Sequence, residues 1–88
     1  MVHDAARQCF ETVVDGRRSV CAYRLQLGTM VFTHTEVPPA LQGRGIAAAL
    51  VAAALAHARE RGLRVRPLCS YVAVYMRRHP ETLDLLDA

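Results

Sequence analysis

One stretch, residues 37–47, organises the chain; it reads VPPALQGRGIA and leads directly into an alanine-rich segment. Gly43 and Gly45 lie just ahead of that segment, where the lack of a side chain lets another molecule come close to the backbone. The first amide N–H groups of a helix have no partner within it, and the helix dipole adds partial positive charge there. Because Arg44 adds a full charge, we expect residues 42–47 to form a phosphate-binding turn, which we call the cradle. The alternative is that the two glycines only punctuate a loop.

Three segments ahead of the cradle have the composition and spacing of short strands. Residues 8–14 are rich in β-branched and aromatic side chains and stop at an Asp-Gly dipeptide, which favours a tight hairpin turn. Residues 21–27 and 29–37 both alternate with a period of two, and a single glycine separates them. A pair of prolines ends the third segment, because proline cannot donate a hydrogen bond to a sheet. The three segments predict an antiparallel meander.

The part of the chain after the cradle predicts a helix, a strand and two short helices. Residues 45–61 contain eight alanines and no interior glycine or proline, and Gly62 is the expected stop. Residues 63–68 read as a fourth strand, which lies parallel to the third when a helix connects the two. Short helices are predicted to begin at Ser70 and at Pro80. The order β-β-β-α-β-α is that of an α+β fold.

Length and composition limit the class of protein. With 88 residues and 52% hydrophobic content, residues 1–88 are expected to form one domain with one small core. No apolar run approaches the ~20 residues of a membrane span, and the first residues lack a basic and then apolar signal sequence. We therefore expect a soluble cytoplasmic protein with no membrane contact.

The cysteines, histidines and arginines indicate which ligands to expect. Cys9, Cys21 and Cys69 include no C-x-x-C pair, and no histidines have metal-ligand spacing, so the expectation is free thiols and no metal. Cys9 and Cys21 fall inside strand patterns and read as packing residues. All 11 basic residues are arginine and give a net charge of +3, which suits an anionic ligand. Weak contact with nucleic acid is the alternative.

The cradle carries a resemblance to a known family. Residues 42–47, QGRGIA, fit the Q/R-x-x-G-x-G/A pattern by which the GNAT superfamily of N-acetyltransferases holds the pyrophosphate of acetyl-coenzyme A (acetyl-CoA). Further resemblance lies in Phe10-Glu11, in Tyr23 and in the segments FTHTEVPP, CSYV and RHPE. Together these are similar to small single-domain GNAT-like proteins. The resemblance implies a truncated GNAT fold without the first helices and last strands, which usually help to bind the acceptor.

The resemblance also implies where acetyl-CoA would bind. Its pyrophosphate would be held by Gln42, Gly43, Arg44, Gly45, Ile46 and Ala47. Its pantetheine arm would pair with the backbone of Glu36 and Val37 as an additional strand. A backbone N–H at the strand end would stabilise the negative charge on the thioester oxygen.

Cys69 follows the fourth strand and precedes a helix start, where unpaired N–H groups favour a thiolate. It either accepts the acetyl group as a nucleophile or lines the acetyl pocket. The alternative is a small buried hydrophobe, because Leu63, Val65 and Cys69 share one face of the predicted strand.

His34 and Glu36 are the candidates for the base that an amine needs in order to attack a thioester. The period of two places them on the same face of the third strand as Met30 and Phe32. Glu36 adjoins the expected thioester site and is the better candidate base. The alternative for His34 is a polar residue on a sheet face with no catalytic role.

Two tyrosines and two arginines after the fourth strand are further candidates for contact with coenzyme A. Tyr71 and Tyr75 fall where many GNATs place a tyrosine that protonates the leaving thiolate, but the usual spacing is not reproduced and both also fit the core. Arg77 and Arg78 are positioned to reach the 3′-phosphate of coenzyme A. Exposed arginines at a helix end need no ligand to explain them.

The sequence therefore predicts an acetyl-CoA-dependent N-acetyltransferase that acetylates a primary amine, directly or through Cys69, with the acceptor unidentified. The second hypothesis is a module that binds acyl-CoA or coenzyme A without turnover. A nucleic-acid binder that uses Arg64, Arg66, Arg77 and Arg78 is the weakest, because no aromatic stacking platform accompanies them.

Overall fold

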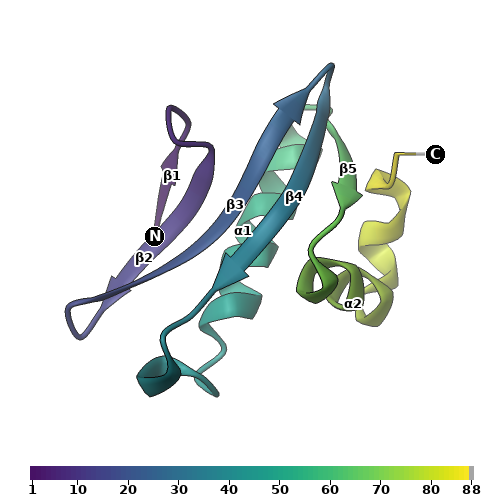
Figure 1. The fold of residues 1–88 in the computed structure, drawn as a ribbon. Coiled ribbons are helices and arrows are strands. Elements are labelled where there is room, and N and C mark those ends of the chain that lie inside the picture. The colour runs from purple at the N-terminus through teal and green to yellow at the C-terminus, as the bar shows by residue number, and fades with distance from the viewer. Residues whose placement is uncertain (88) are drawn as a thin grey trace.

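The computed structural model describes residues 1–87 and contains one five-stranded sheet in the order β1-β2-β3-β4-β5 (Figure 1). The strands are β1 (Val2–Asp4), β2 (Cys9–Val14), β3 (Arg17–Gln26), β4 (Thr29–Glu36) and β5 (Arg64–Pro67). The pairs β1–β2, β2–β3 and β3–β4 are antiparallel, and β5 runs parallel to β4. The predicted α+β fold is confirmed, including the antiparallel meander. The predicted fourth strand corresponds to β5 and is parallel to its neighbour, as expected.

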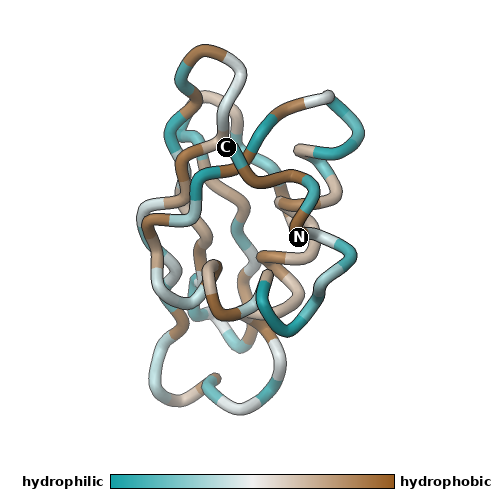
Figure 2. Tube along the Cα trace, turned by 90° about the vertical axis from the view of Figure 1, so that its right-hand side faces the viewer, coloured by the Kyte–Doolittle hydropathy of each residue, from teal (hydrophilic) through white to brown (hydrophobic). Residues whose placement is uncertain are grey.

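The helical elements are η1 (Pro39–Leu41), α1 (Ile46–Glu60), α2 (Ser70–Arg78) and η2 (Pro80–Leu85). α1 lies along the back of β3 and β4 in the view of Figure 1. Its buried alanines, Ala54 and Ala58, let the helix approach the sheet closely because they have only a methyl group to accommodate. Hydrophobic and hydrophilic stretches alternate along the trace in Figure 2, and no helix within residues 1–87 is long and apolar enough to cross a membrane.

One hydrophobic cluster joins the sheet to the helices. Phe32 and Met30 of β4, Leu50 of α1, Val65 of β5 and Val72 of α2 are all fully buried in it. Their burial is the main stabilising contribution of the fold, at roughly 1.5–3 kcal/mol for each large apolar side chain. Since residues from α2 and β5 share the cluster with β4, the C-terminal part of the chain is tied to the strand that leads into the cradle.

The strand β1 is a feature that the sequence analysis did not predict. Its three residues pair with β2, and the ring of His3 stacks on Phe10 with the centroids 4.1 Å apart. His3 Nε2 shares a hydrogen bond with the hydroxyl of Tyr23 at 2.6 Å, and the ring of His57 on α1 meets His3 edge-on. A three-residue strand with a histidine and an aspartate has no strand pattern of its own, so these contacts with the rest of the fold hold it in place.

A β-bulge changes the side-chain pattern of β4. Phe32 pairs with Tyr23, but the next pair is His34 with Ala22, so Thr33 is an extra residue in the strand. The prediction that His34 and Glu36 share the face of Phe32 was therefore wrong. Residues after the bulge change faces because one inserted residue shifts a period of two by half a cycle.

Candidate functional site

The strands β4 and β5 separate halfway along β4. Their pairing ends at Phe32 and Pro67, and the next contact is the amide of Cys69, which donates to the carbonyl of Phe32 at 2.9 Å. The chain then turns into α2 instead of continuing beside β4. The second half of β4 therefore pairs with β3 on one side only, and its other edge can pair with an extended ligand.

A cleft of about 380 Å³ lies at this open edge and runs to the start of α1. Its walls come from the end of β4, the loop around η1, the first turn of α1 and the first turn of α2. The lining residues are Thr35, Val37, Leu41, Gln42, Gly43, Gly45, Ile46, Ala47, Ala48 and Tyr71. The structure thus brings Val37 together with five of the six predicted cradle residues.

The cradle has the backbone geometry of an anion site. Gly43 and Gly45 have φ of +84° and +76°, a region that other residues rarely adopt, and a Cβ at either position would meet no atom within 4 Å. The first helical hydrogen bond runs from the amide of Ala49 to the carbonyl of Gly45, so the amides of Ile46, Ala47 and Ala48 have no acceptor within the helix. The first turn of α1 carries no acidic residue. Open space, free N–H groups and the helix dipole together fit a pyrophosphate.

Two cradle side chains brace the loop. Gln42 Nε2 donates to the carbonyl of Val37 at 3.2 Å, which ties the loop to the end of β4. Arg44 Nη1 lies 3.2 Å from Asp15 Oδ2 in the β2–β3 turn, and Arg44 does not line the cleft. Both members of this ion pair are more than half exposed, so Arg44 can exchange Asp15 for a stronger anion at little cost.

Cys69 lies beside the cleft. It is half-buried, packs against the hydrophobic cluster and is the residue immediately before α2. Its Sγ is 3.5 Å from Thr35 Oγ1, and Thr35 lines the cleft. The packing role that was the alternative for Cys69 therefore coexists with a position next to the open edge of β4. Cys9 and Cys21 are buried in their strands, as predicted.

His34 and Glu36 point the same way, as expected, but toward the sheet face opposite the hydrophobic cluster. His34 Nε2 and Glu36 Oε2 are 2.9 Å apart, and the two side chains are 58% and 67% exposed. An imidazole that hydrogen-bonds a carboxylate in this way restricts the rotamers of both groups. The pair can receive or relay a proton from a molecule that approaches the open face of the sheet.

A second, smaller hollow continues the cleft toward the end of α2. It measures about 170 Å³, shares Ala48 and Tyr71 with the cleft, and also contains Arg78. The rings of Tyr75 and His79 stack within it at 3.9 Å, and burial raises the pKa of the Tyr75 hydroxyl. Tyr71 thus reaches the cleft itself, whereas Tyr75 belongs to the neighbouring hollow.

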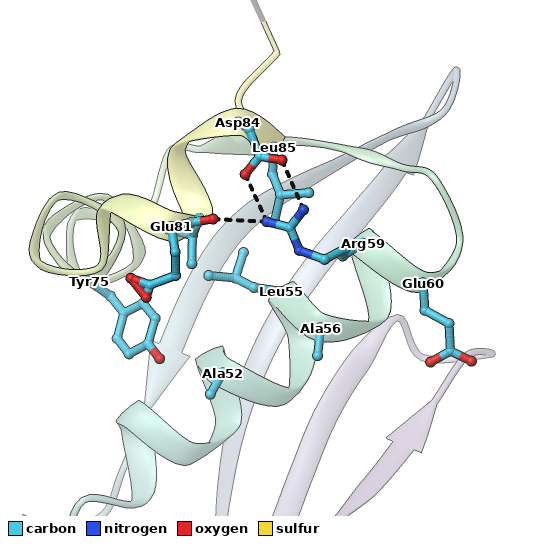
Figure 3. Close-up of a pocket in the computed structure, with 10 residues that line it drawn as sticks. Ala52, Leu55, Ala56, Arg59, Glu60, Tyr75, Glu81, Asp84 and Leu85 are labelled. Atoms are coloured by element: carbon cyan, nitrogen blue, oxygen red, sulfur yellow. Dashed lines mark hydrogen bonds and ion pairs between the residues drawn. The ribbon is translucent and has the colours of Figure 1, made fainter.

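A larger hollow, about 750 Å³, lies elsewhere, between α1, α2 and η2 (Figure 3). Figure 3 shows Arg59 reaching from α1 to η2, where it donates to both carboxylate oxygens of Asp84 and to the carbonyl of Glu81. Its guanidinium holds the pKa of Asp84 below the ordinary value. Because Arg59 is bonded to η2, this hollow is best explained as the junction between two helices. Within residues 1–87, no group of three His, Cys, Asp or Glu side chains could hold a metal ion.

The cleft joins an open strand edge to a glycine-capped helix start, an arrangement that fits an extended, anionic ligand. A family model described as GCN5-related N-acetyl-transferase matches residues 9–85. The chain belongs to this family, and the predicted resemblance is confirmed. Family membership indicates acetyl transfer as the chemistry to expect.

Similar proteins include Protein NATD1 of Xenopus tropicalis, 36% identical over 81 residues that cover 89% of this chain and 74% of the relative. Protein NATD1 of Mus musculus is 37% identical over the same length, with the same coverage. Protein NATD1 of Homo sapiens is 37% identical over 81 residues, which cover 89% of this chain and 72% of the relative.

Sequence reasoning missed three residues of the cleft, Thr35, Leu41 and Ala48. The period of two in residues 29–37 assigned Thr35 to the face opposite the core, and only the bulge reverses that assignment. Leu41 is fully buried just after the prolines, where an apolar residue in a polar loop was the available signal.

Proposed function

We propose that this protein is an acetyl-CoA-dependent N-acetyltransferase that transfers the acetyl group to a primary amine. The observation that carries the proposal is the continuity of the cleft, which joins the open edge of β4 to the glycine-capped start of α1. An extended thioester arm and a pyrophosphate are the two chemical groups that these surfaces would recognise together. Membership of the GCN5-related family supports the same donor.

The chain offers a distinct group to each part of the donor. The amides around Gly45 and Ala47 would bind the pyrophosphate, and the backbone of Glu36 and Val37 would pair with the pantetheine arm. The carbonyl of Val37 already accepts from Gln42, so we expect the arm to use the other backbone groups at this edge. Arg78 would reach the 3′-phosphate through the second hollow.

Glu36 would act as the general base for the acceptor amine. An ammonium group must lose a proton before its nitrogen can attack a carbonyl, and Glu36 is the carboxylate nearest the end of β4. His34, hydrogen-bonded to Glu36, would keep that carboxylate oriented. When bound, acetyl-CoA supplies the activated thioester, and a backbone N–H at the strand end would stabilise the charge that develops on its oxygen.

Two routes for acetyl transfer differ in the role of Cys69. In direct transfer it would only lie beside the donor site, next to Thr35. In the relay, its sulfur takes the acetyl group from coenzyme A, which leaves as a thiol, and the amine then displaces Cys69. Incubation with acetyl-CoA alone, followed by intact-mass measurement, separates them: the relay leaves one acetyl group on the parent and none on Cys69→Ala. Full activity of Cys69→Ala with no adduct on the parent would establish direct transfer.

A binding module without turnover is the second candidate. The exposure of His34 and Glu36 favours it, because a base in contact with bulk water lacks the dry environment that strengthens catalytic electrostatics. Such a module would bind coenzyme A and acetyl-CoA similarly and acetylate nothing.

Isothermal titration with coenzyme A, acetyl-CoA and dephospho-coenzyme A tests the ligand class. We expect both full-length ligands to bind and the dephospho form to bind more weakly, and Arg78→Ala to remove that difference. Release of free thiol with a panel of primary amines then distinguishes the enzyme from the binding module. No binding of any of the three ligands would contradict both candidates.

A further inference from the structure

The hydroxyl of Thr35 lies between two sulfur atoms. Its Oγ1 is 3.5 Å from the Sγ of Cys69 on one side and 3.8 Å from the Sγ of Cys21 on the other. Thr35 itself lines the cleft, and the two sulfur atoms lie behind it, with Cys21 fully buried and Cys69 half-buried. Building on the proposed function, we infer that Thr35 is a positioning residue, which holds the sulfur of Cys69 beside the cleft and stabilises it when that sulfur is negatively charged.

The bulge in β4 creates this arrangement. Without the extra residue Thr33, the period of two would direct Thr35 toward the opposite face of the sheet, with His34 and Glu36 on the cluster side. With it, Thr35 pairs with Cys21 and faces the side of the sheet on which α2 packs. The amide of Cys69 is anchored to the carbonyl of Phe32, so Cys69 and Thr35 are both fixed to β4.

Hydrogen bonding in the neutral state follows from the number of protons available. Thr35 has one hydroxyl proton, which it donates to the sulfur of Cys21. Its oxygen then accepts the thiol proton of Cys69. Cys21 is fully buried, and this burial raises its pKa to about 11, so it remains a thiol at neutral pH.

The same three groups rearrange when Cys69 becomes a thiolate by losing its proton to water. The Thr35 hydroxyl turns and donates to the Cys69 sulfur, while the Cys21 thiol donates to Thr35 Oγ1. No proton moves between Thr35 and Cys21, so the rearrangement needs only two bond rotations. A hydroxyl that donates to a charged sulfur favours the charged form, and the buried thiol behind it strengthens that donor.

Few other titratable groups share this environment. Tyr71 of α2 lines the same cleft, and Cys21 of β3 lies behind Thr35. His34 and Glu36, on the same strand as Thr35, point toward the opposite face. The reactivity of Cys69 should therefore depend on the Thr35 hydroxyl more than on a neighbouring ion.

The test measures alkylation of Cys69 by iodoacetamide in the ligand-free protein between about pH 6 and pH 9, where thiols titrate. Peptide mass spectrometry follows Cys69 separately from the buried Cys9 and Cys21. Thr35→Val keeps the shape of the side chain but removes the hydroxyl, and Thr35→Ser keeps the hydroxyl. We expect alkylation in Thr35→Val to be about three- to tenfold slower near neutral pH, as loss of one hydrogen bond predicts, with its profile moved to higher pH. Thr35→Ser should retain the parent profile.

Thr33→Val is the matched control, because it makes the same substitution on the exposed bulge residue two positions away. It should alkylate as the parent does. Should Thr35→Val not fold, Thr35→Ala carries the same test. Parent-like alkylation in the variant without the hydroxyl, or equal slowing in Thr33→Val, would overturn the inference.

The alkylation assay needs no acetyl-CoA, so its outcome is independent of the proposed function. Slowed alkylation in a protein that binds no coenzyme A would leave the role of Thr35 intact and remove the acetyltransferase proposal. Normal coenzyme A binding, with a Thr35→Val alkylation profile like that of the parent, would remove the role of Thr35 and leave the acetyltransferase proposal intact.

Discussion

The two halves of β4 differ in burial and in the number of strands with which they pair. Thr29, Met30, Val31 and Phe32 are all buried, and they pair with β3 on one side and β5 on the other. Residues 33–36 are exposed or half-buried, and residues 34–36 pair with β3 only. The bulge at Thr33 and the departure of β5 after Pro67 occur at the same level of the sheet.

Within eight residues, β4 thus changes from a strand that is packed on both edges to one that has an edge open to a ligand. A strand paired on both edges has its backbone groups satisfied and its apolar side chains packed, so it contributes to the fold and offers nothing to a ligand. A strand with one free edge leaves N–H and C=O groups that another chain or ligand can pair with. Substitutions in the first half should therefore affect stability, and substitutions in the second half should affect binding and turnover.

The largest expected effect lies in the first half. Phe32→Ala removes a fully buried ring from the centre of the hydrophobic cluster and should lower the free energy of unfolding by about 3–5 kcal/mol. Urea denaturation monitored by circular dichroism measures this change in the free energy of unfolding. Thr33→Ala, one residue further on, should change the free energy of unfolding by less than about 0.5 kcal/mol. Similar losses in both variants would show that the bulge does not divide the strand as described.

In the second half, Glu36→Gln should leave stability and acetyl-CoA affinity unchanged and lower turnover by ~10² to 10⁴, the usual contribution of a general base. The loss should become smaller as the pH rises toward the pKa of the amine, where less deprotonation is needed. Steady-state rates over a range of pH measure the loss of turnover and its dependence on pH, and titration with acetyl-CoA is the control for binding. Unchanged turnover at neutral pH would assign the base to His34 or to solvent, and lost binding would make Glu36 structural.

The cradle allows a sharper comparison, because α1 has a glycine with positive φ just beyond each end. Gly45→Ala and Gly62→Ala both force alanine into the left-handed region, at roughly 1–2 kcal/mol of stability each. The space beside both glycines is open, so no clash adds to that cost. Only Gly45→Ala should also weaken coenzyme A binding, by about tenfold or more, which is ~1.4 kcal/mol.

Equal affinity for coenzyme A in Gly45→Ala and Gly62→Ala, measured by isothermal titration, would remove the cradle assignment. A loss of affinity confined to Gly45→Ala would support it independently of any stability change, because both variants carry the same backbone strain.

The sequence predicted the elements whose signals are local. The glycines and prolines around the cradle, the alanine-rich helix and the period of two in the strands each identify an element without reference to the rest of the chain. The bulge has no such signal, because Thr33 lies in an unbroken alternating run and is displaced only by pairing with β3. The sequence therefore singled out Val37 and five cradle residues that line the cleft, but it placed His34 and Glu36 on the wrong face and omitted Thr35.

The strand β1 could not be predicted either, because it has no strand pattern of its own and depends on contacts with distant residues. A substitution at His3 of this strand should have the smallest of the expected effects. Burial, followed by the charges of His57 and Arg61, lowers the pKa of His3 below its ordinary value of 6.5. The folded state therefore favours neutral His3, and the unfolded state binds more protons below pH 6.5. The stability that His3 contributes is complete above pH 6.5 and is lost as the pH falls through 6.5 toward the folded-state pKa.

His3 acts on the first half of β4 through Tyr23, which shares its hydrogen bond and packs its ring 6.2 Å from that of Phe32. His3→Phe keeps an aromatic ring on Phe10 but cannot take up a proton. We expect its melting temperature to fall less than that of the parent between neutral pH and about pH 5.5, the range in which histidine titrates. Coenzyme A affinity at neutral pH should be the same in both, since the second half of β4 and the cradle are untouched. If the parent and His3→Phe lose stability in parallel across this range, the acid sensitivity arises elsewhere and β1 is held by packing alone.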